Sequence, residues 1–257
     1  MVKHMTSPRL LLDLGNSRLK WALSDGTELR FGAAVAHEPG GLGDLSPIWA
    51  AAAGAGSVWL SSTALSLSPT LIQAVAERLD LETQVFVSPK EALGIRSAYD
   101  QPATLGSDRF LAMAGARAQV SGAFLVADAG TALTLDMVDD GGQHLGGLIV
   151  PSPVLMRDAL HRGTAGIRTG ELVRVREFAR NTDDAVWSGA CLACTALIGH
   201  AYRHGALGVG ADVELLLAGG SMPALAPHLS MPHRHLPNLV LEGLALWAST
   251  TLDAAGR

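Results

Sequence analysis

Apolar residues recur in two similar stretches that lie about half the chain apart. Residues 10–12 and 124–127 are continuous apolar runs, and each run ends at an aspartate that is followed two positions later by a glycine. After each of these bends, apolar and polar residues alternate, at residues 19–23 and 133–137. A period of two is typical of a half-buried strand, so each stretch predicts a β-hairpin whose tight turn carries the acid and the glycine.

Between and after the hairpins, the pattern predicts strands that alternate with amphipathic helices. In the first half, further strands are expected at residues 27–35, 57–61 and 83–87, and helices at residues 48–53, 69–79 and 107–119. In the second half, strands are expected at residues 148–150 and 213–218, and helices at residues 153–161, 183–204 and 240–252. This alternation predicts an α/β protein of two related halves, which we place at residues 1–119 and 120–257.

Composition narrows the class of protein. Hydrophobic residues make up 48% of the chain, charged residues make up 17%, and the net charge is -5 without any run of lysine or arginine. We therefore expect a globular protein that does not bind nucleic acid. The apolar run before Asp13 is too short for a signal peptide or a membrane span, so a cytoplasmic protein without membrane association is expected. Cys191 and Cys194 form an isolated pair in an apolar helix and are expected to be buried thiols.

The two predicted turns have the composition of a phosphate-binding site. One reads Asp13-Leu14-Gly15-Asn16 and the other Asp128-Ala129-Gly130-Thr131. Glycine lets backbone amides approach an anion, the amide or hydroxyl side chain adds a hydrogen-bonding group, and the carboxylate can hold a hydrated cation. A single copy would be explained as a tight turn, but a second copy in the same context favours a polyphosphate that is bound from two sides. The glycine patterns of P-loop and dinucleotide-binding proteins do not occur.

A third candidate group lies at the predicted start of the helix at residues 107–119. Asp108 and Arg109 follow Gly106, and either Ser107 or Asp108 is expected to cap the helix. In the functional interpretation, the Asp108 carboxylate accepts the proton of an attacking hydroxyl, while Arg109 and the helix amides bind an anionic substrate. Capping alone explains Asp108 about equally well.

Together, these motifs resemble the type III pantothenate kinases, also known as Bvg accessory factor proteins, of the actin, sugar-kinase and Hsp70 ATPase superfamily. The most specific match is the Tyr-x-x-Pro-x-x-Leu-Gly-x-Asp-Arg run at residues 99–109; the two Asp-x-Gly turns, residues 146–151 and Gly219-Gly220 add to it. The resemblance covers nearly the whole chain. It implies two duplicated actin-like (ribonuclease H-like) halves, with mixed sheets flanked by helices and a nucleotide cleft between the halves. It also implies ATP-dependent phosphorylation of pantothenate to 4'-phosphopantothenate, the first step of coenzyme A biosynthesis.

The resemblance implies roles for individual residues. Asp108 would be the general base, Mg2+ would lie near Asp13 through water, and a monovalent cation, K+ or NH4+, would bind at Asp128. The residues implied to bind ATP are Asp13, Leu14, Gly15, Asn16, Ser17, Arg18, Leu19 and Lys20 of the first turn, and Thr131 of the second. Those implied to bind pantothenate are Tyr99, Gly106, Ser107, Asp108, Arg109 and, near the interface of a homodimer, Thr182.

Three departures and two rival functions accompany this resemblance. Ser17 stands where the family more often has threonine, and Ser152 stands where a glycine usually follows proline. The segment at residues 163–168 fits the family's Thr-Ala-x-Leu-Pro pattern only in part. A rival small-molecule kinase of the same superfamily would act on a sugar or amino sugar, and it would need a polar, hydroxyl-binding loop in place of residues 99–109. A non-catalytic accessory protein would only bind nucleotide, and the presence of Asp13, Asp108 and Asp128 together argues against it.

Overall fold

The structure is a computed structural model that describes residues 7–38, 41–164, 174–210 and 212–255. By their contacts, these residues form two compact units, which are described separately below. The first unit comprises the described residues of Met1–Gln119 and Leu239–Arg257, and the second comprises those of Val120–Asn238.

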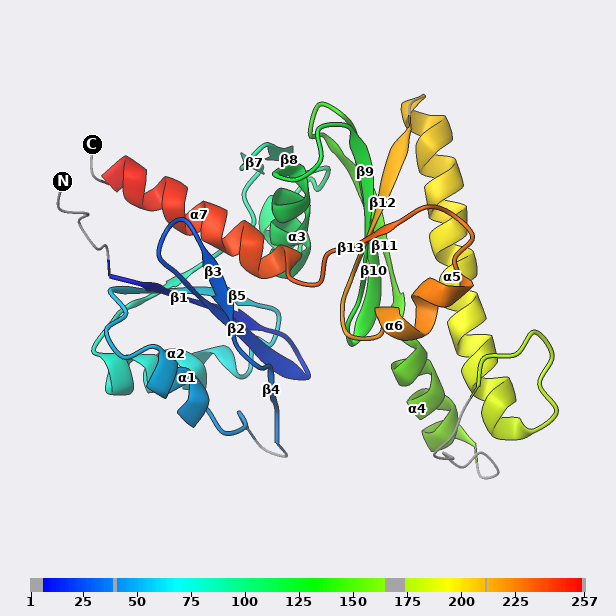
Figure 1. The fold of residues 1–257 in the computed structure, drawn as a ribbon, viewed down its shortest axis with the longest axis horizontal. Coiled ribbons are helices and arrows are strands. Elements are labelled where there is room, and N and C mark those ends of the chain that lie inside the picture. Colours follow the sequence, from blue (N-terminus) through cyan, green and yellow to red (C-terminus); the bar gives the residue numbers. More distant parts are fainter. Residues whose placement is uncertain (1–6, 39–40, 165–173, 211, 256–257) are drawn as a thin grey trace. The chain divides into compact units, whose positions relative to one another are not determined.

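The first unit is a mixed sheet with helices on both faces (Figure 1). Its strands are β1 (Arg9–Leu14), β2 (Arg18–Ser24), β3 (Leu29–Phe31), β4 (Val35–Ala36), β5 (Ser57–Ser62) and β6 (Thr83–Val85), with a separate small hairpin of β7 (Glu91–Ala92) and β8 (Ile95–Arg96). Its helices are α1 (Ser46–Ala51), α2 (Ser68–Leu79), the short 3-10 helix η1 (Pro102–Thr104), α3 (Ser107–Arg117) and α7 (Leu239–Ala255). The strand order is β3-β2-β1-β5-β6, with β4 paired to β2. Strand β1 is antiparallel to β2 and parallel to β5.

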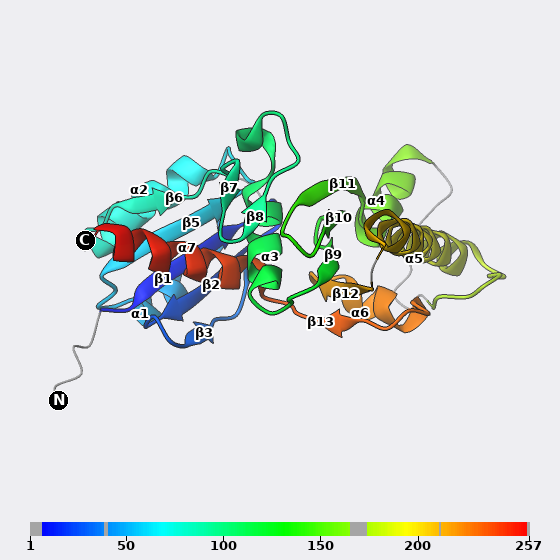
Figure 2. The same cartoon turned by 90° about the horizontal axis from the view of Figure 1, so that it is seen from above.

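Strand alternation assigns the two faces of this sheet. Leu10 and Leu12 of β1 join a core with Ile48 of α1, so this face lies under α1 and α2. On the opposite face, the Trp59 ring of β5 packs edge-on against Trp247 of α7, with their centroids 5.0 Å apart. Helices α3 and α7 therefore cover the second face, as Figures 1 and 2 show. Successive residues of a strand point to opposite faces of the sheet. Asp13 follows Leu12 directly, so the Asp13 side chain lies on the face covered by α3 and α7.

Helix α7 packs closely on α3 because glycines lie where the two helices meet. A Cβ atom on Gly115 would lie 2.3 Å from the Leu239 carbonyl oxygen, and one on Gly243 would lie 2.1 Å from that of Leu111. The Gln119 side chain also donates a 2.6 Å hydrogen bond to Glu242. The sequence-based division assigned residues 239–257 to the second half, and it differs from the compact units here because the apolar side of α7 is buried in the first unit.

The second unit repeats the topology of the first. Its sheet has the order β11-β10-β9-β12-β13, so an antiparallel hairpin is again continued by a parallel strand beside its first strand. The strands are β9 (Ala123–Ala129), β10 (Ala132–Val138), β11 (His144–Pro151), β12 (Val213–Ala218) and β13 (Arg234–His235). The helices are α4 (Pro153–Gly163), α5 (Thr182–Val209), α6 (Met222–Leu225) and the 3-10 helix η2 (Ala226–His228). The shared strand order is what a duplicated fold predicts.

Helix α5 covers one face of the second sheet. Its residues Cys191, Cys194 and Ile198 are fully buried in a core with Leu125 and Leu215. This confirms the expected burial of the two thiols, and burial raises the pKa of both to about 11, with the neighbouring Cys194 adding to the shift of Cys191. By length and composition alone α5 could cross a membrane, but core helices pass the same test, and α5 packs on the sheet in this way.

The expected strand at residues 27–35 is divided into β3 and β4. A Cβ atom on Gly32 would lie 2.0 Å from the indole ring of Trp21, whose Nε1 donates a 3.0 Å hydrogen bond to the Ala33 carbonyl oxygen. The indole therefore occupies the position that a continuous strand would need. The strand expected at residues 213–218 is confirmed at both ends, and the alternation at residues 19–23 lies within β2.

Candidate active site

The first turn, residues 13–18, connects β1 to β2 and is closed by a 3.1 Å hydrogen bond from the Gly15 amide to the Arg18 carbonyl oxygen. In the sheet, Asp13 is the register partner of Lys20 on β2 and of Ser61 on β5. Register partners in neighbouring strands share a face, so these three residues form a polar row beneath α3 and α7. Asp13 is only 7% exposed, whereas residues 16–18 of the turn are exposed.

The start of α3 is fixed to the end of β5 by buried hydroxyl groups. Ser107 Oγ donates to the Ser62 carbonyl oxygen at 3.1 Å, so the 3.0 Å bond between Ser61 and Ser107 has Ser61 as its donor. Neighbouring strands lie about 4.8 Å apart, so Asp13 is one strand spacing from its register partner Ser61. Ser61 in turn is hydrogen-bonded to Ser107, which directly precedes Asp108. The first unit alone therefore brings Asp13 and Asp108 to the same end of its sheet.

Ser61 was not identified in the sequence as part of this group. The Ser-Ser pair at the end of the strand predicted at residues 57–61 was visible, but its contact with Ser107 is non-local and depends on strand order.

The expected cap of α3 is not present. Gly106 occupies the N-cap position and no side chain caps the helix. Ser107 uses its hydroxyl to contact the sheet, and Asp108 accepts a 2.8 Å hydrogen bond from the amide of Arg109 instead. A Cβ atom on Gly106 would lie 2.6 Å from Asp108 Oδ1, so this glycine leaves space for the carboxylate. This weakens the capping interpretation of Asp108.

Arg109 and Tyr99 form one contact group beside Asp108. The Arg109 guanidinium donates a 2.8 Å hydrogen bond to the Tyr99 hydroxyl and lies 5.7 Å from the centre of its ring. Arg109 is 6% exposed. The Tyr99 loop is held in turn by Lys90, whose ammonium group donates to the carbonyl oxygens of Ser97 and Tyr99 at 2.8 and 3.3 Å. The structure thus brings together the residues of the 99–109 run that were predicted to share a site.

The second turn, residues 128–132, is built like the first and is closed by a 2.9 Å bond from the Gly130 amide to the Ala132 carbonyl oxygen. Asp128 is the register partner of Thr134 on β10 and of Ala218 on β12. Gly219 follows β12 with φ +90°, and a Cβ atom there would lie 2.4 Å from Asp128 Oδ1 and 2.5 Å from the Ala129 carbonyl oxygen. The glycine after β12 therefore allows close approach to the acid of the turn.

Two further predicted positions lie in the second unit. The carbonyl oxygen of Thr131 accepts a 3.3 Å hydrogen bond from the amide of Ser152. Ser152 also caps α4, because its hydroxyl accepts a hydrogen bond from the Leu155 amide at 3.3 Å. Thr182 is the first residue of α5 and is exposed, with Asn181 as the N-cap.

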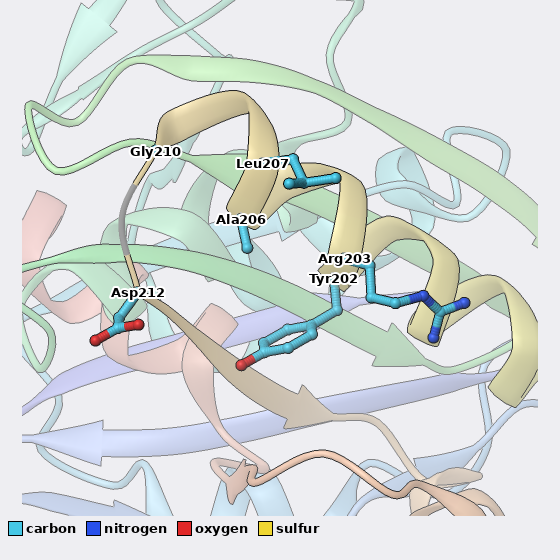
Figure 3. A pocket seen from close by; sticks show the side chains of 6 residues that line it. All are labelled: Tyr202, Arg203, Ala206, Leu207, Gly210 and Asp212. Atoms are coloured by element: carbon cyan, nitrogen blue, oxygen red, sulfur yellow. The ribbon is translucent and has the colours of Figure 1, made fainter.

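A shallow cavity of about 730 Å³ in the second unit holds none of these residues (Figure 3). It is lined by Tyr202, Arg203, Ala206, Leu207, Gly210 and Asp212. Asp212 directly precedes β12, whereas Asp128 pairs with the last residue of that strand. With a rise of about 3.3 Å per residue, the cavity and the second turn lie at opposite ends of the strand.

The acids of the two turns suit different ions. No group of three histidine, cysteine, aspartate or glutamate residues that could hold a metal occurs in the part of the chain that the structure describes. Mg2+ does not need such a group, because it keeps several waters and is usually bound by one or two carboxylates together with substrate phosphates. Asp13 fits that pattern. At the second turn, Asp128 Oδ1 and the Ala129 carbonyl oxygen are both within 2.5 Å of the position that a Cβ atom on Gly219 would occupy, so the two oxygens lie less than about 5 Å apart. Oxygen pairs of this kind suit a hard cation.

Comparison with known proteins gives consistent matches over the chain. A family model for type III pantothenate kinase matches residues 9–204. A type III pantothenate kinase from Xanthomonas campestris is 39% identical over 240 residues, which cover 93% of this chain and 96% of the relative. Another from Nitrosococcus oceani is 34% identical over 253 residues, which cover 94% of each chain.

Solved structures show the fold. A conserved Baf family protein from Campylobacter jejuni has a TM-score of 0.60 at 18% identity and covers 95% of this chain and 99% of its own. An acetate kinase from Porphyromonas gingivalis has a TM-score of 0.53 at 10% identity, with 96% and 100% covered. These likenesses confirm the predicted α/β fold of actin-like halves, with mixed sheets flanked by helices.

Proposed function

Because this chain belongs to the type III pantothenate kinase family and is a phosphotransferase that phosphorylates pantothenate in coenzyme A biosynthesis, we propose that its two Asp-x-Gly turns bind ATP and that Asp108 is the general base. The observation that carries this proposal is the hydroxyl connection from Ser61 to Ser107, which brings Asp108 to the end of the sheet where the first turn lies. A base for phosphoryl transfer has to lie there, because the attacking hydroxyl must reach the γ-phosphate of the bound nucleotide.

The proposed step is an in-line displacement. The primary hydroxyl of pantothenate donates a hydrogen bond to the Asp108 carboxylate while its oxygen approaches the γ-phosphorus. As the new phosphorus–oxygen bond forms, the bond from the γ-phosphorus to the bridging oxygen breaks, ADP leaves, and the hydroxyl proton passes to Asp108. Positioning and charge neutralisation supply most of the acceleration in such a reaction.

The surrounding groups have proposed roles that follow from their chemistry. Arg109, oriented by Tyr99, binds the pantothenate carboxylate, to which a guanidinium can donate two hydrogen bonds. Gly106, Ser107 and the first turn of α3 complete this substrate site. The amides of the first turn that are not used within it, together with Lys20 and Thr131, bind the phosphates. Mg2+, which Asp13 would hold through water, supplies neutralisation of the phosphate oxygens when it is bound.

We also propose that a monovalent cation, K+ or NH4+, binds at Asp128. Support comes from Asp128 Oδ1 and the Ala129 carbonyl oxygen, which lie close to each other and to the Gly219 backbone. The kinase is further proposed to be cytoplasmic, where ATP and coenzyme A precursors are available.

The direct test of this function is a coupled assay of ADP release. With pantothenate as the acceptor, ADP release is expected to depend on Mg2+ and to rise when K+ or NH4+ replaces a larger organic cation. Sugars and amino sugars, tested in parallel, are expected to give no release above that of ATP alone. Release with a sugar but not with pantothenate would support the rival kinase, and none with any acceptor would support the accessory protein.

Replacing Asp13 with asparagine is expected to weaken the binding of Mg2+–ATP by about tenfold to a hundredfold, because the carboxylate that would hold the hydrated cation is lost. Calorimetric titration with Mg2+ and a non-hydrolysable ATP analogue measures the effect. Asp25→Asn is a matched control in the same unit, since that carboxylate accepts hydrogen bonds from Thr27 and Glu28 in the turn after β2. Equal affinities in the two variants would contradict the assigned role.

A homodimer is proposed through strand β11. This strand is at the edge of its sheet and exposes Leu145, Leu148 and Ile149, of which Ile149 is 59% exposed. A long apolar edge strand is an interaction surface, and a second copy of the chain is its most direct partner because symmetric dimers can bury the same patch on both subunits. Thr182 would then contribute to substrate binding near this interface.

Ile149→Lys is expected to weaken the dimer by about tenfold or more, because the interface would have to bury an unpaired charge. Sedimentation velocity over a range of concentrations measures the monomer fraction. Val87→Lys is the matched control, since Val87 is 62% exposed in the first unit, outside its strands. A variant at Ile149 that remains as dimeric as the control would exclude β11 from the interface.

A further inference from the structure

His37 binds the first turn twice. It follows β4, which pairs with the beginning of β2, and its amide extends that ladder by donating to the Ser17 carbonyl oxygen at 3.1 Å. Its imidazole Nε2 then reaches the carbonyl oxygen of Gly15 at 2.7 Å. One residue from outside the turn therefore binds two of its peptide groups. The imidazole binds the Gly15–Asn16 peptide, and the backbone amide binds the Ser17–Arg18 peptide.

The bond to Gly15 determines where an amide of the turn points. A carbonyl oxygen can only accept, so Nε2 carries the proton in this contact. In a trans, planar peptide the N–H points opposite to the C=O, and the Asn16 N–H is therefore directed away from His37. The Gly15 amide is already used by Arg18, so it is not available to an anion. Glycine has more backbone freedom than any other residue, and the imidazole restricts the Gly15–Asn16 peptide to one orientation.

The other ring nitrogen of His37 is left without a hydrogen bond to the described residues in this arrangement. His37 Nδ1 is buried and has no hydrogen-bond partner among the residues that the structure describes. A buried nitrogen without a partner loses its hydration, and an apolar side chain of similar size would fill the same space without that loss. The ring is therefore explained by what Nε2 does at Gly15, and packing alone does not account for it.

We propose that His37 is a positioning residue for ATP, which orients the Asn16 amide toward the phosphates through its bond to Gly15. This inference rests on the proposed function of the first turn as an ATP-binding site. His37 acts only through the turn, so its loss is expected to change the affinity for ATP while leaving pantothenate binding as it is.

The test compares variants that keep or remove the donor. His37→Leu removes it, and His37→Gln restores an amide donor at about the position of Nε2. We expect His37→Leu to raise the KM for ATP about tenfold, with the KM for pantothenate within about twofold of the parent, and His37→Gln to restore most of the ATP affinity. His233→Leu is the control, because His233 is an exposed histidine of the other unit whose ring contacts Met231. If His37→Leu does not fold, His37→Asn, which stays polar but is too short to reach Gly15, is expected to show the same loss.

Binding of a non-hydrolysable ATP analogue, measured by calorimetry, separates this inference from the proposed function. If Asp13→Asn loses affinity for the analogue and His37→Leu does not, the role of His37 is overturned while the turn remains the ATP site. If neither variant loses affinity, the first turn is not the ATP site and both proposals fall. Equal rises in KM for ATP and for pantothenate in His37→Leu would show a general structural effect and would also overturn the inference.

Discussion

Asp108→Asn is expected to lower kcat by about 10²- to 10⁴-fold while the affinity for ATP stays within a few-fold of the parent. The amide keeps the size of the side chain, so Gly106 and the start of α3 are undisturbed, but it cannot accept the proton of the pantothenate hydroxyl. The large effect falls on turnover because this interaction forms as the hydroxyl attacks, whereas ATP binding is assigned to the two turns. Steady-state kinetics together with calorimetry of an ATP analogue measure both quantities.

Asp100→Asn is the matched control for this experiment. Asp100 lies in the same 99–109 run but is exposed and outside α3, so its replacement is expected to leave kcat nearly unchanged. A kcat for Asp108→Asn within tenfold of this control would contradict the role of Asp108 as base. A lost affinity for ATP with unchanged kcat at saturation would assign Asp108 to the nucleotide site instead.

Gly219→Ala is expected to destabilise the second unit by about 2 to 4 kcal/mol and to abolish activation by K+. The added methyl would lie 2.4 Å from Asp128 Oδ1 and 2.5 Å from the Ala129 backbone, at a φ of +90° that side chains rarely adopt. Either the backbone after β12 or the second turn must move, and movement of the turn separates the oxygens that would bind the cation. Denaturant unfolding and a K+ titration of kcat measure the two effects.

Gly208→Ala controls for the substitution itself. Gly208 lies in α5 of the same unit, and a Cβ atom there meets nothing within 4 Å, so alanine is expected to be neutral or slightly stabilising through its higher helix propensity. If Gly219→Ala were as stable as this control and still activated by K+, the close approach at the second turn would have no role in cation binding.

Much of the fold could be predicted from the sequence because its signals are local. The period of two after each aspartate identified both hairpins, and the apolar run at residues 213–218 identified β12 at both ends. The partners of α7 could not be predicted in this way. Its apolar periodicity shows that it packs on something, but only the glycine contacts with α3 show that it joins the first unit.

The candidate site was predictable in part for the same reason. The 99–109 run contains both Tyr99 and Arg109, and their side chains are in contact in the structure. Ser61 and His37 could not be found, because their contacts with Ser107 and Gly15 depend on strand order and on the path of β4. The sequence also left capping and catalysis equally open for Asp108, and the observed N-cap at Gly106 weakens the first of these.

A crystal structure with Mg2+, a non-hydrolysable ATP analogue and pantothenate would test the account most directly. The account predicts that the primary hydroxyl of pantothenate lies within about 2.6–3.2 Å of the Asp108 carboxylate and faces the γ-phosphate, with both Asp-x-Gly turns in contact with the triphosphate. A pantothenate hydroxyl bound away from Asp108, or a triphosphate that contacts neither Asp13 nor the second turn, would contradict it.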